Sequence, residues 1–274
     1  MIDGPVEVMG IVNVTPDSFS DGGVAWDTAD AIAQARQQVA DGAAIVDVGA
    51  ESTRPGAGET PVEEEWRRLA PVLESLIADG IRVSVDTRKA EVMRRALALG
   101  VPVINDVSAL TFDPLSQDVM AAASCSVVLM HARGLPENMQ DDPRYDDVVG
   151  EVYDYLAARI ADCEAAGIER SRIVIDPGIG FGKTFRQNLT LLADLQRFRE
   201  LGVPLLIGAS RKGFIGWLTG VETAGERLGG SVGAALAAAM NGADIVRVHD
   251  VAETVQALAV FQSAIRGQPV RSDR

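Results

Sequence analysis

The chain has 274 residues, of which 47% are hydrophobic and 5% aromatic, so it can bury a substantial core without disulfides or metals. Its formal charge of −14 and pI of about 4.6 argue against general binding to nucleic acid. Cys125 and Cys163 belong to no CxxC or Cys/His cluster, which argues against a zinc site or a disulfide framework. The sequence begins without a signal-peptide pattern and has no apolar run near the roughly 18 residues of a membrane span. We therefore expect a cytoplasmic protein without a nucleic-acid or membrane partner.

A repeated unit runs along the chain. A short run rich in Val and Ile ends in polar residues, and a segment with helical spacing follows. Such continuous apolar runs are typical of parallel strands that helices cover. Eight runs are predicted to be strands, at residues 6–14, 43–51, 81–87, 101–107, 125–131, 172–178, 203–210 and 243–249.

The segments between these runs have the pattern of helices. Apolar residues recur three and four positions apart in residues 62–79 and 147–166, which predicts an amphipathic helix in each. A glycine stands after a helical segment and before a strand where a left-handed helix end favours it. This occurs at Gly42, Gly80, Gly100, Gly167, Gly202 and Gly242.

Eight strand–helix units in one chain predict the α/β class and a single-domain (β/α)8 barrel, whose usual length is about 250 residues. We assign residues 1–267 to the barrel and residues 268–274 to a C-terminal tail. A doubly wound open sheet is the alternative. The first predicted strand is not followed by GxGxxG, which argues against that alternative.

Polar side chains stand at the ends of nearly all predicted strands, and in a barrel these ends line the active site. A single polar strand end is often a helix cap, but a ring of them predicts a site. The ring consists of Asn13, Ser52, Thr53, Arg54, Asp86, Asn105, Met130, His131, Asp176, Ser210, Arg211, Lys212, Arg247 and His249.

Side-chain alternation indicates which of these residues point inward. Val83 and Val85 form the apolar face of their strand, so Asp86 is expected to point into the barrel mouth. Arg247 and His249 likewise share one face of the last strand.

The charges in the ring fall into two groups. Asp86, Asn105 and Asp176 can accept hydrogen bonds from a guanidine-like heterocycle. The second group is cationic or can become so, and it consists of Arg54, Lys212, Arg247 and His249. Arg54, Arg247 and His249 suit a phosphate or pyrophosphate, so the ring predicts a two-part ligand.

Other motifs predict no site. GFGKT at 180–184 lacks the spacing of a P-loop, and HExxH is absent. His131 fits a structural residue at a strand end better than a ligand.

Motifs in chain order closely resemble those of the dihydropteroate synthase family of the folate pathway. They are MGIVNVTPDSFSDGG (9–23), VDVGAESTRPGAG (46–58), VSVDTRK (83–89), INDVSA (104–109), VLMHARG (128–134), IDPGIGFGKT (175–184), IGASRKGF (207–214) and RVHDV (247–251). One motif per predicted strand is far more specific than any motif alone.

The resemblance implies an enzyme that joins 6-hydroxymethyl-7,8-dihydropterin pyrophosphate to para-aminobenzoate with the help of Mg²⁺. Catalytic roles are implied for Asp86, Arg54, Lys212 and Arg247. The implied pterin pocket is Asp86, Asn105, Asp176, Lys212 and Met130. The implied pyrophosphate site is Asn13, Arg54, Arg247 and His249, with Asn13 also at the magnesium. Thr53, Pro55, Phe181 and Ser210 correspond to the para-aminobenzoate pocket, where sulfonamides compete, and Phe19 and Asp21 to a mobile loop.

The sequence departs from the family pattern at Ala50, where a second glycine is frequent and where a methyl group is expected to crowd the strand end slightly. Two alternatives remain open, a non-catalytic pterin-binding paralogue and a pterin-dependent methyltransferase domain. The family is usually dimeric through its last helices, so residues 231–240 are a candidate homodimer surface, although they can equally pack within the barrel.

Overall fold

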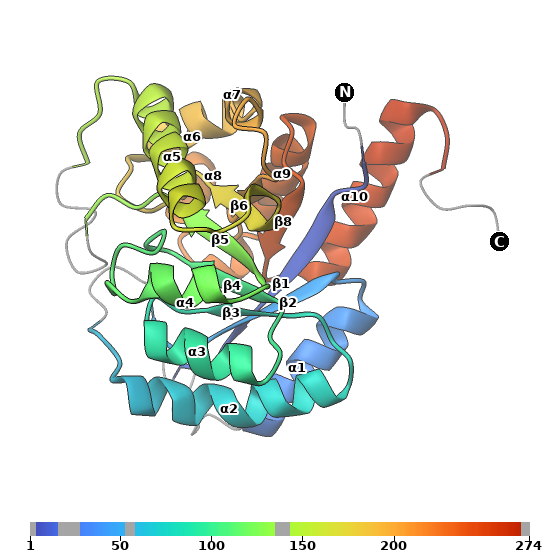
Figure 1. Ribbon diagram of the computed structural model, residues 1–274. Coiled ribbons are helices and arrows are strands. Elements are labelled where there is room, and N and C mark those ends of the chain that lie inside the picture. Colours follow the sequence, from blue (N-terminus) through green and yellow to red (C-terminus); the bar gives the residue numbers. More distant parts are fainter. Residues whose placement is uncertain (1–3, 16–27, 53–57, 135–142, 270–274) are drawn as a thin grey trace.

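The computed structural model describes residues 4–15, 28–52, 58–134 and 143–269. In these residues strands and helices alternate along the chain (Figure 1). The strands are β1 (Glu7–Asn13), β2 (Ile45–Gly49), β3 (Val83–Asp86), β4 (Val103–Asp106), β5 (Ser126–Met130), β6 (Ile173–Asp176), β7 (Leu206–Ile207) and β8 (Ile245–Val248). The helices are α1 (Thr28–Ala40), α2 (Val62–Ala78), α3 (Ala90–Ala98), α4 (Ser116–Ala122), α5 (Val148–Ala165), α6 (Phe185–Ala193), α7 (Gln196–Arg199), α8 (Gly213–Thr219), α9 (Leu228–Met240) and α10 (Val251–Arg266).

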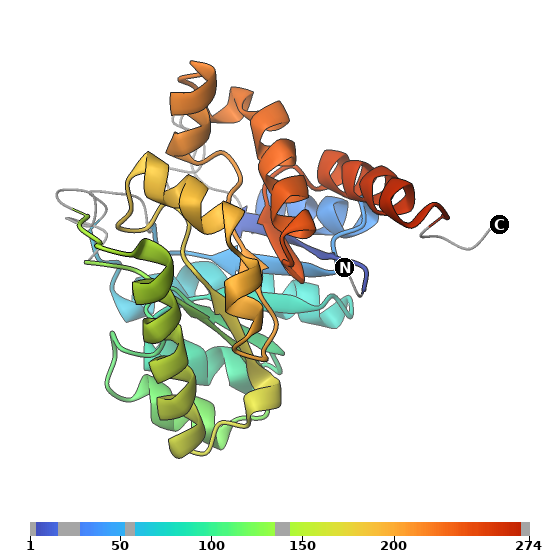
Figure 2. The same ribbon diagram turned by 90° about the horizontal axis from the view of Figure 1, so that it is seen from above.

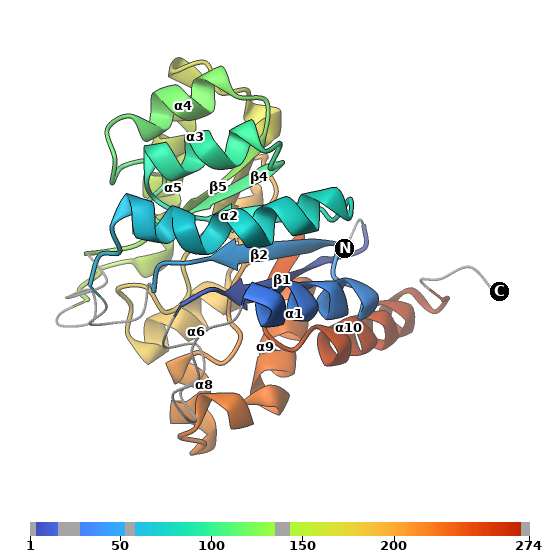
Figure 3. The same cartoon turned by 90° about the horizontal axis from the view of Figure 1, so that it is seen from below.

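The strands form one parallel sheet in the order β6-β5-β4-β3-β2-β1-β8-β7. A parallel bridge between Ile175 and Leu205 brings β6 beside β7 and nearly closes the barrel. The longer helices lie outside the strands in the side view and in the views from above and below (Figures 1, 2 and 3). The predicted (β/α)8 barrel is confirmed, and the open-sheet alternative is wrong.

The seventh strand is much shorter than the predicted run of residues 203–210. Only Leu206–Ile207 forms a strand. Pro204 lacks the N–H that a strand ladder uses, and the backbone turns at Arg211, whose φ is 59°. The extended run therefore ends early and leaves a turn at the barrel mouth.

The strands carry two apolar layers on opposite faces. Outward side chains such as Val48 and Val85 pack against the helices in the main core. A smaller inward cluster fills the lower part of the barrel, and it consists of Met9, Ile45, Val103, Val128, Leu206 and Ile245. Because side chains alternate, residues two positions further along the strands also point inward. On β2, β4 and β8 these residues are Asp47, Asn105 and Arg247, so polar side chains lie above the apolar layer.

The helix ends follow the sequence closely. α2 and α5 cover the two predicted helical segments within one residue at each end. The six glycines predicted at helix ends all have positive φ, between 69° and 103°. At the other end of the chain, α10 ends at Arg266, whose guanidinium donates to the Gly4 carbonyl at 3.0 Å and joins the two ends of the described chain. None of the described helices is long and apolar enough to cross a membrane.

Candidate active site at the barrel mouth

The inward side chains of four strands meet in one cluster of hydrogen bonds. Arg247 on β8 donates from Nε to Asp47 Oδ2 on β2 at 2.6 Å, and from a terminal nitrogen to Asp86 Oδ2 on β3 at 3.1 Å. Asn105 on β4 donates to the same Asp47 oxygen at 2.9 Å. The structure thus brings together the predicted residues Asp86, Asn105 and Arg247 around a buried aspartate.

Asp47 is the residue of this group that we did not predict from the sequence. It lies on β2 two positions after Ile45, which points into the barrel, and its side chain is fully buried. The alternation that placed Asp86 inside, applied to residues 45–49, places Asp47 inside as well. The alternation pattern that identifies Asp47 was therefore present in the sequence. Asp47 was missed because only residues at the strand ends were considered, and it precedes the end of β2.

Asp176 ends β6 beside Met130, the last residue of β5, with which it is in register. Its Oδ1 accepts the N–H of Gly178 at 2.7 Å. Gly178 has a φ of 71°, and a Cβ there would lie 1.9 Å from the His131 carbonyl oxygen, so only glycine fits this turn. The turn leaves the Asp176 carboxylate buried at the mouth.

Lys212 follows the β7 turn and contacts the loop after β6. Its Nζ lies 4.2 Å from the centroid of the Phe181 ring, a distance typical of a cation–π contact. On the same turn, Ser210 Oγ lies 3.0 Å from His249 Nδ1. Phe181 and Ser210, which the resemblance assigns to para-aminobenzoate, are therefore direct neighbours of Lys212, assigned to the pterin, and His249, assigned to pyrophosphate.

We refer to Asp47, Asp86, Asn105, Asp176, Lys212 and Arg247 as the mouth cluster. Burial raises the pKa of Asp86 to about 7, with Arg247 opposing the rise and Asp47 adding to it. Burial likewise raises the pKa of Asp176 to about 6 and lowers that of Lys212 to about 8. Three titratable groups therefore change charge near neutral pH, as is common in active sites.

The loop after β6 is anchored from below by Lys183, the lysine of GFGKT. Its Nζ is buried 2.9 Å from His131 Nδ1 and donates to the carbonyl oxygens of Gly178 at 3.0 Å and Phe181 at 2.9 Å. The lysine of GFGKT thus makes contacts within the protein, and His131 lies in the same buried network, as expected of a structural residue.

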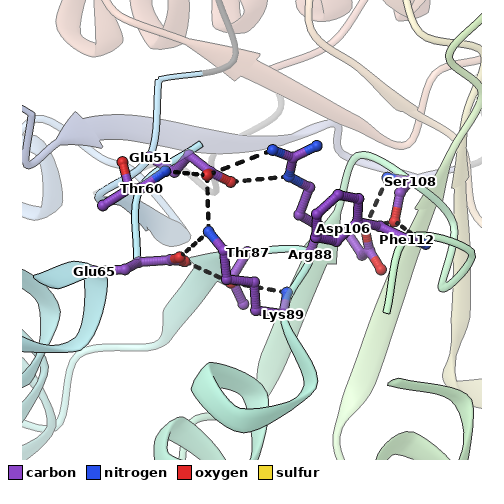
Figure 4. Close-up of polar contacts among 9 residues, drawn as sticks. All are labelled: Glu51, Thr60, Glu65, Thr87, Arg88, Lys89, Asp106, Ser108 and Phe112. Carbon is purple, nitrogen blue, oxygen red and sulfur yellow. Dashed lines mark hydrogen bonds and ion pairs between the residues drawn. The ribbon is translucent and has the colours of Figure 1, made fainter. Parts of the chain in front are cut away.

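A second buried group of charges lies beside the mouth, and we refer to it as the rim cluster (Figure 4). It comprises Glu51, Glu65, Thr87, Arg88 and Lys89. Lys89 Nζ lies 2.8 Å from Glu51 and 2.6 Å from Glu65, and Arg88 Nε lies 3.0 Å from Glu51. Glu65 also accepts from the Thr87 hydroxyl at 2.6 Å. The cluster joins the ends of β2 and β3 to α2.

The remaining predicted residues are placed as follows. Asn13 ends β1 in register with Gly49 of β2. Ala50, the departure from the family pattern, is buried in the outer core, so its methyl group points away from the mouth. Phe19, Asp21, Thr53, Arg54 and Pro55 lie outside the described residues.

Comparison with known proteins agrees with this geometry. Residues 9–249 match the family described as pterin binding enzyme. The dihydropteroate synthase of Neisseria meningitidis serogroup C is 51% identical over 96% of this chain and 93% of its own length.

Solved structures of the Xanthomonas albilineans dihydropteroate synthase are similar as well. The complex with 4-aminobenzoic acid is 52% identical with a TM-score of 0.90, over 98% of this chain and 95% of that one. The complex with 7,8-dihydropteroate is 49% identical with a TM-score of 0.87, over 98% and 96%. The chain therefore belongs to the pterin-binding enzymes and, within them, to the dihydropteroate synthases, which makes it a transferase of folate biosynthesis.

Proposed function

We propose that the barrel mouth condenses 6-hydroxymethyl-7,8-dihydropterin pyrophosphate with para-aminobenzoate, giving 7,8-dihydropteroate and pyrophosphate. The observation that carries the proposal is the mouth cluster. Three carboxylates and two cations lie at the C-terminal ends of the strands, where a ligand with a donor-rich edge and an anionic group finds partners for both.

The pterin half fits the carboxylate side. Asp176 takes the two N–H groups of the amino edge, because a carboxylate matches two parallel donors. Asn105 and Asp86 take the ring nitrogens, Lys212 takes the carbonyl edge, and Met130 covers the ring from β5. Support comes from the register of Met130 with Asp176 and from the burial of both.

In the proposed reaction the C–O bond between the pterin methylene and pyrophosphate breaks, and its electron pair leaves with pyrophosphate. The positive charge that develops on the pterin is stabilised by the Asp86 carboxylate, and the negative charge on the leaving group by Arg54, Arg247 and His249. The para-aminobenzoate nitrogen then bonds to the methylene carbon and loses one proton to solvent water. No side chain acts as a nucleophile.

The residues at the mouth fit a magnesium ion held mainly by the substrate. Mg²⁺ prefers oxygen ligands and often binds through one or two protein groups together with phosphates. Asn13 offers an amide oxygen at the end of β1, and the described residues contain no group of three acidic, His or Cys side chains that could hold a metal. When bound, the ion neutralises charge on the pyrophosphate.

The para-aminobenzoate half is assigned to Phe181 and Ser210 together with Thr53 and Pro55, and Phe19 and Asp21 to a loop that covers the mouth. Phe181 and Ser210 support this because they flank Lys212 and His249. An amine held there is beside both the pterin and the leaving group.

Purified protein with labelled para-aminobenzoate tests the proposal. We expect labelled dihydropteroate and one pyrophosphate per product. A protein that binds pterin without forming product is the non-catalytic paralogue. Methyl transfer from a methylated pterin, with no pyrophosphate released, identifies the methyltransferase alternative.

We also propose that two copies pair through α8 and α9 and that the protein works in the cytoplasm. The pairing face holds Trp217 and Leu218, whose exposed fractions are 50% and 55%, beside a groove of about 430 Å³ between α6, α8 and α9. Sedimentation of Trp217→Asp should give a monomer, whereas Leu115→Asp, equally exposed elsewhere, should leave a dimer. Monomeric wild-type protein would overturn the proposed dimer.

The cytoplasmic location is a separate proposal, and cell fractionation tests it.

A further inference from the structure

The buried Asp47 has no role in the reaction as written above, yet it lies at the centre of the groups that do. Its Oδ2 accepts from both Arg247 Nε and Asn105 Nδ2, at 2.6 and 2.9 Å. Its side chain has no exposed surface. A carboxylate that is buried this deeply costs stability unless its partners compensate, so its position between Arg247 and Asn105 requires an explanation.

Position in the barrel explains why Asp47 cannot contact a substrate directly. It stands on β2 one inward layer below Gly49, and its side chain has no exposed surface, whereas that of Arg247, which it contacts, is 20% exposed. Asp47 therefore lies behind the residues that face the mouth, and it acts through them.

We propose that Asp47 is a positioning residue, which fixes Arg247 and Asn105 from below so that both point at the pterin and its leaving group. Without this anchor, Arg247 can turn wholly toward Asp86. Its guanidinium would then be less available to pyrophosphate, and Asn105 would lose the acceptor that sets the direction of its amide. The inference rests on the roles proposed for Arg247, Asn105 and Asp86.

The charge of Asp47 also acts on Asp86. The groups that shift the Asp86 pKa are Arg247 on β8, Asp47 on β2, Glu65 on α2 and Asp106 on β4, and Lys212 lies in the same cluster. Among the carboxylates, Asp47 contributes the most to the rise. Removing its charge should lower the Asp86 pKa, and so move the acidic limb of the pH profile of kcat/KM for the pterin substrate to lower pH.

The test compares Asp47→Asn and Asp47→Ser with wild type, each assayed for kcat and both KM values from pH 5 to 9. We expect kcat at pH 8 to fall about tenfold, because leaving-group stabilisation weakens, with a smaller change in KM for para-aminobenzoate. The acidic limb should move down by about one pH unit in both variants. Two variants are used because either one alone can fail to fold.

Asp106→Asn is the matched control. Asp106 is equally buried on β4, but its oxygens accept from Ser108 and from the Leu110 N–H, and it contacts neither Arg247 nor the Asn105 side chain. We expect this variant to lose stability while keeping kcat within about threefold and shifting the acidic limb less. A folded Asp47 variant with wild-type kcat and an unmoved limb would overturn the proposal. A wild-type pH profile without an acidic limb would contradict the catalytic role proposed for Asp86. In that case the kcat values of the Asp47 variants would still test the positioning role proposed for Asp47.

Discussion

The mouth cluster and the rim cluster are neighbouring groups of buried charges that differ in their ratio of carboxylates to cations. In the rim cluster two carboxylates face two cations at 2.6 to 3.0 Å. Although burial acts to raise it, hydrogen bonds from Arg88 and Lys89 hold the pKa of Glu51 below its usual value, whereas burial raises the pKa of Glu65. In the mouth cluster three carboxylates face two cations, and burial moves three pKa values toward neutrality.

This difference in charge balance indicates a structural role for the rim cluster and a ligand-binding role for the mouth cluster. A balanced buried network needs no further partner and connects elements, here β2, β3 and α2. An unbalanced one is less favourable until a ligand supplies the missing donors. Burial alone would not have told the two clusters apart, because both are largely shielded from solvent.

The largest effect is expected at Asp176. Asp176→Ala should weaken binding of 7,8-dihydropteroate by at least about 100-fold, because the amino edge of the pterin loses its charged acceptor. Calorimetric titration measures this. Asp176→Asn is the comparison variant: it keeps one oxygen for the Gly178 N–H, but it removes the charge and replaces the other oxygen with an NH2 donor, so pterin binding should weaken here as well. Affinity within a few-fold of wild type in the alanine variant would show that the pterin lies elsewhere.

The pH dependence of kcat/KM for the pterin substrate sharpens the contrast, because this ratio reports the groups of the free enzyme. Only ionised Asp86 can stabilise the pterin cation, and its pKa is raised to about 7 by burial. We therefore expect kcat/KM to fall about tenfold per pH unit below that value. It should fall again above about pH 8, where Lys212, whose pKa burial lowers to about 8, loses its charge. Steady-state rates at pterin concentrations well below KM check both limbs. An acidic limb at the ordinary aspartate pKa would mean that the Asp86 carboxylate is not shielded as described.

A break in the rim cluster should affect folding rather than chemistry. Lys89→Met leaves Glu51 and Glu65 buried without their shared cation, so the free energy of unfolding should fall by about 3–5 kcal/mol. Urea denaturation measures the loss, and kcat of the folded protein should stay near wild type. Arg67→Met, which breaks an exposed pair with Glu64, is the control and should leave the urea midpoint in place. A large loss of kcat in folded Lys89→Met would show that the rim cluster also contributes to catalysis.

The smallest effect is expected at Ala50. Its methyl group lies in the outer core, away from the mouth, so Ala50→Gly should leave both KM values unchanged and cost about 1 kcal/mol of stability or less. Kinetics and thermal melting measure the two quantities. A changed KM for para-aminobenzoate would show that this position does influence the second substrate.

The sequence was sufficient for the barrel, because strand runs, helical spacing and glycines such as Gly42 and Gly167 are local signals. It also placed Asp86, Asn105, Asp176 and Arg247 at strand ends. The pairing of Arg247 with Asp47 could not be predicted, since it joins residues 200 positions apart and depends on the register of neighbouring strands. The shortness of β7 was missed for a local reason, the proline and the left-handed turn that flank it.

The distinction between the two clusters is tested most directly by kcat of two variants that each neutralise one buried carboxylate. Asp86 belongs to the mouth cluster and Glu65 to the rim cluster, and burial raises the pKa of both. At pH 8, with folding verified by circular dichroism, Asp86→Asn should lose at least about 100-fold in kcat, whereas Glu65→Gln should stay within about threefold of wild type. Equal losses in the two variants, or a larger loss in Glu65→Gln, would contradict the account.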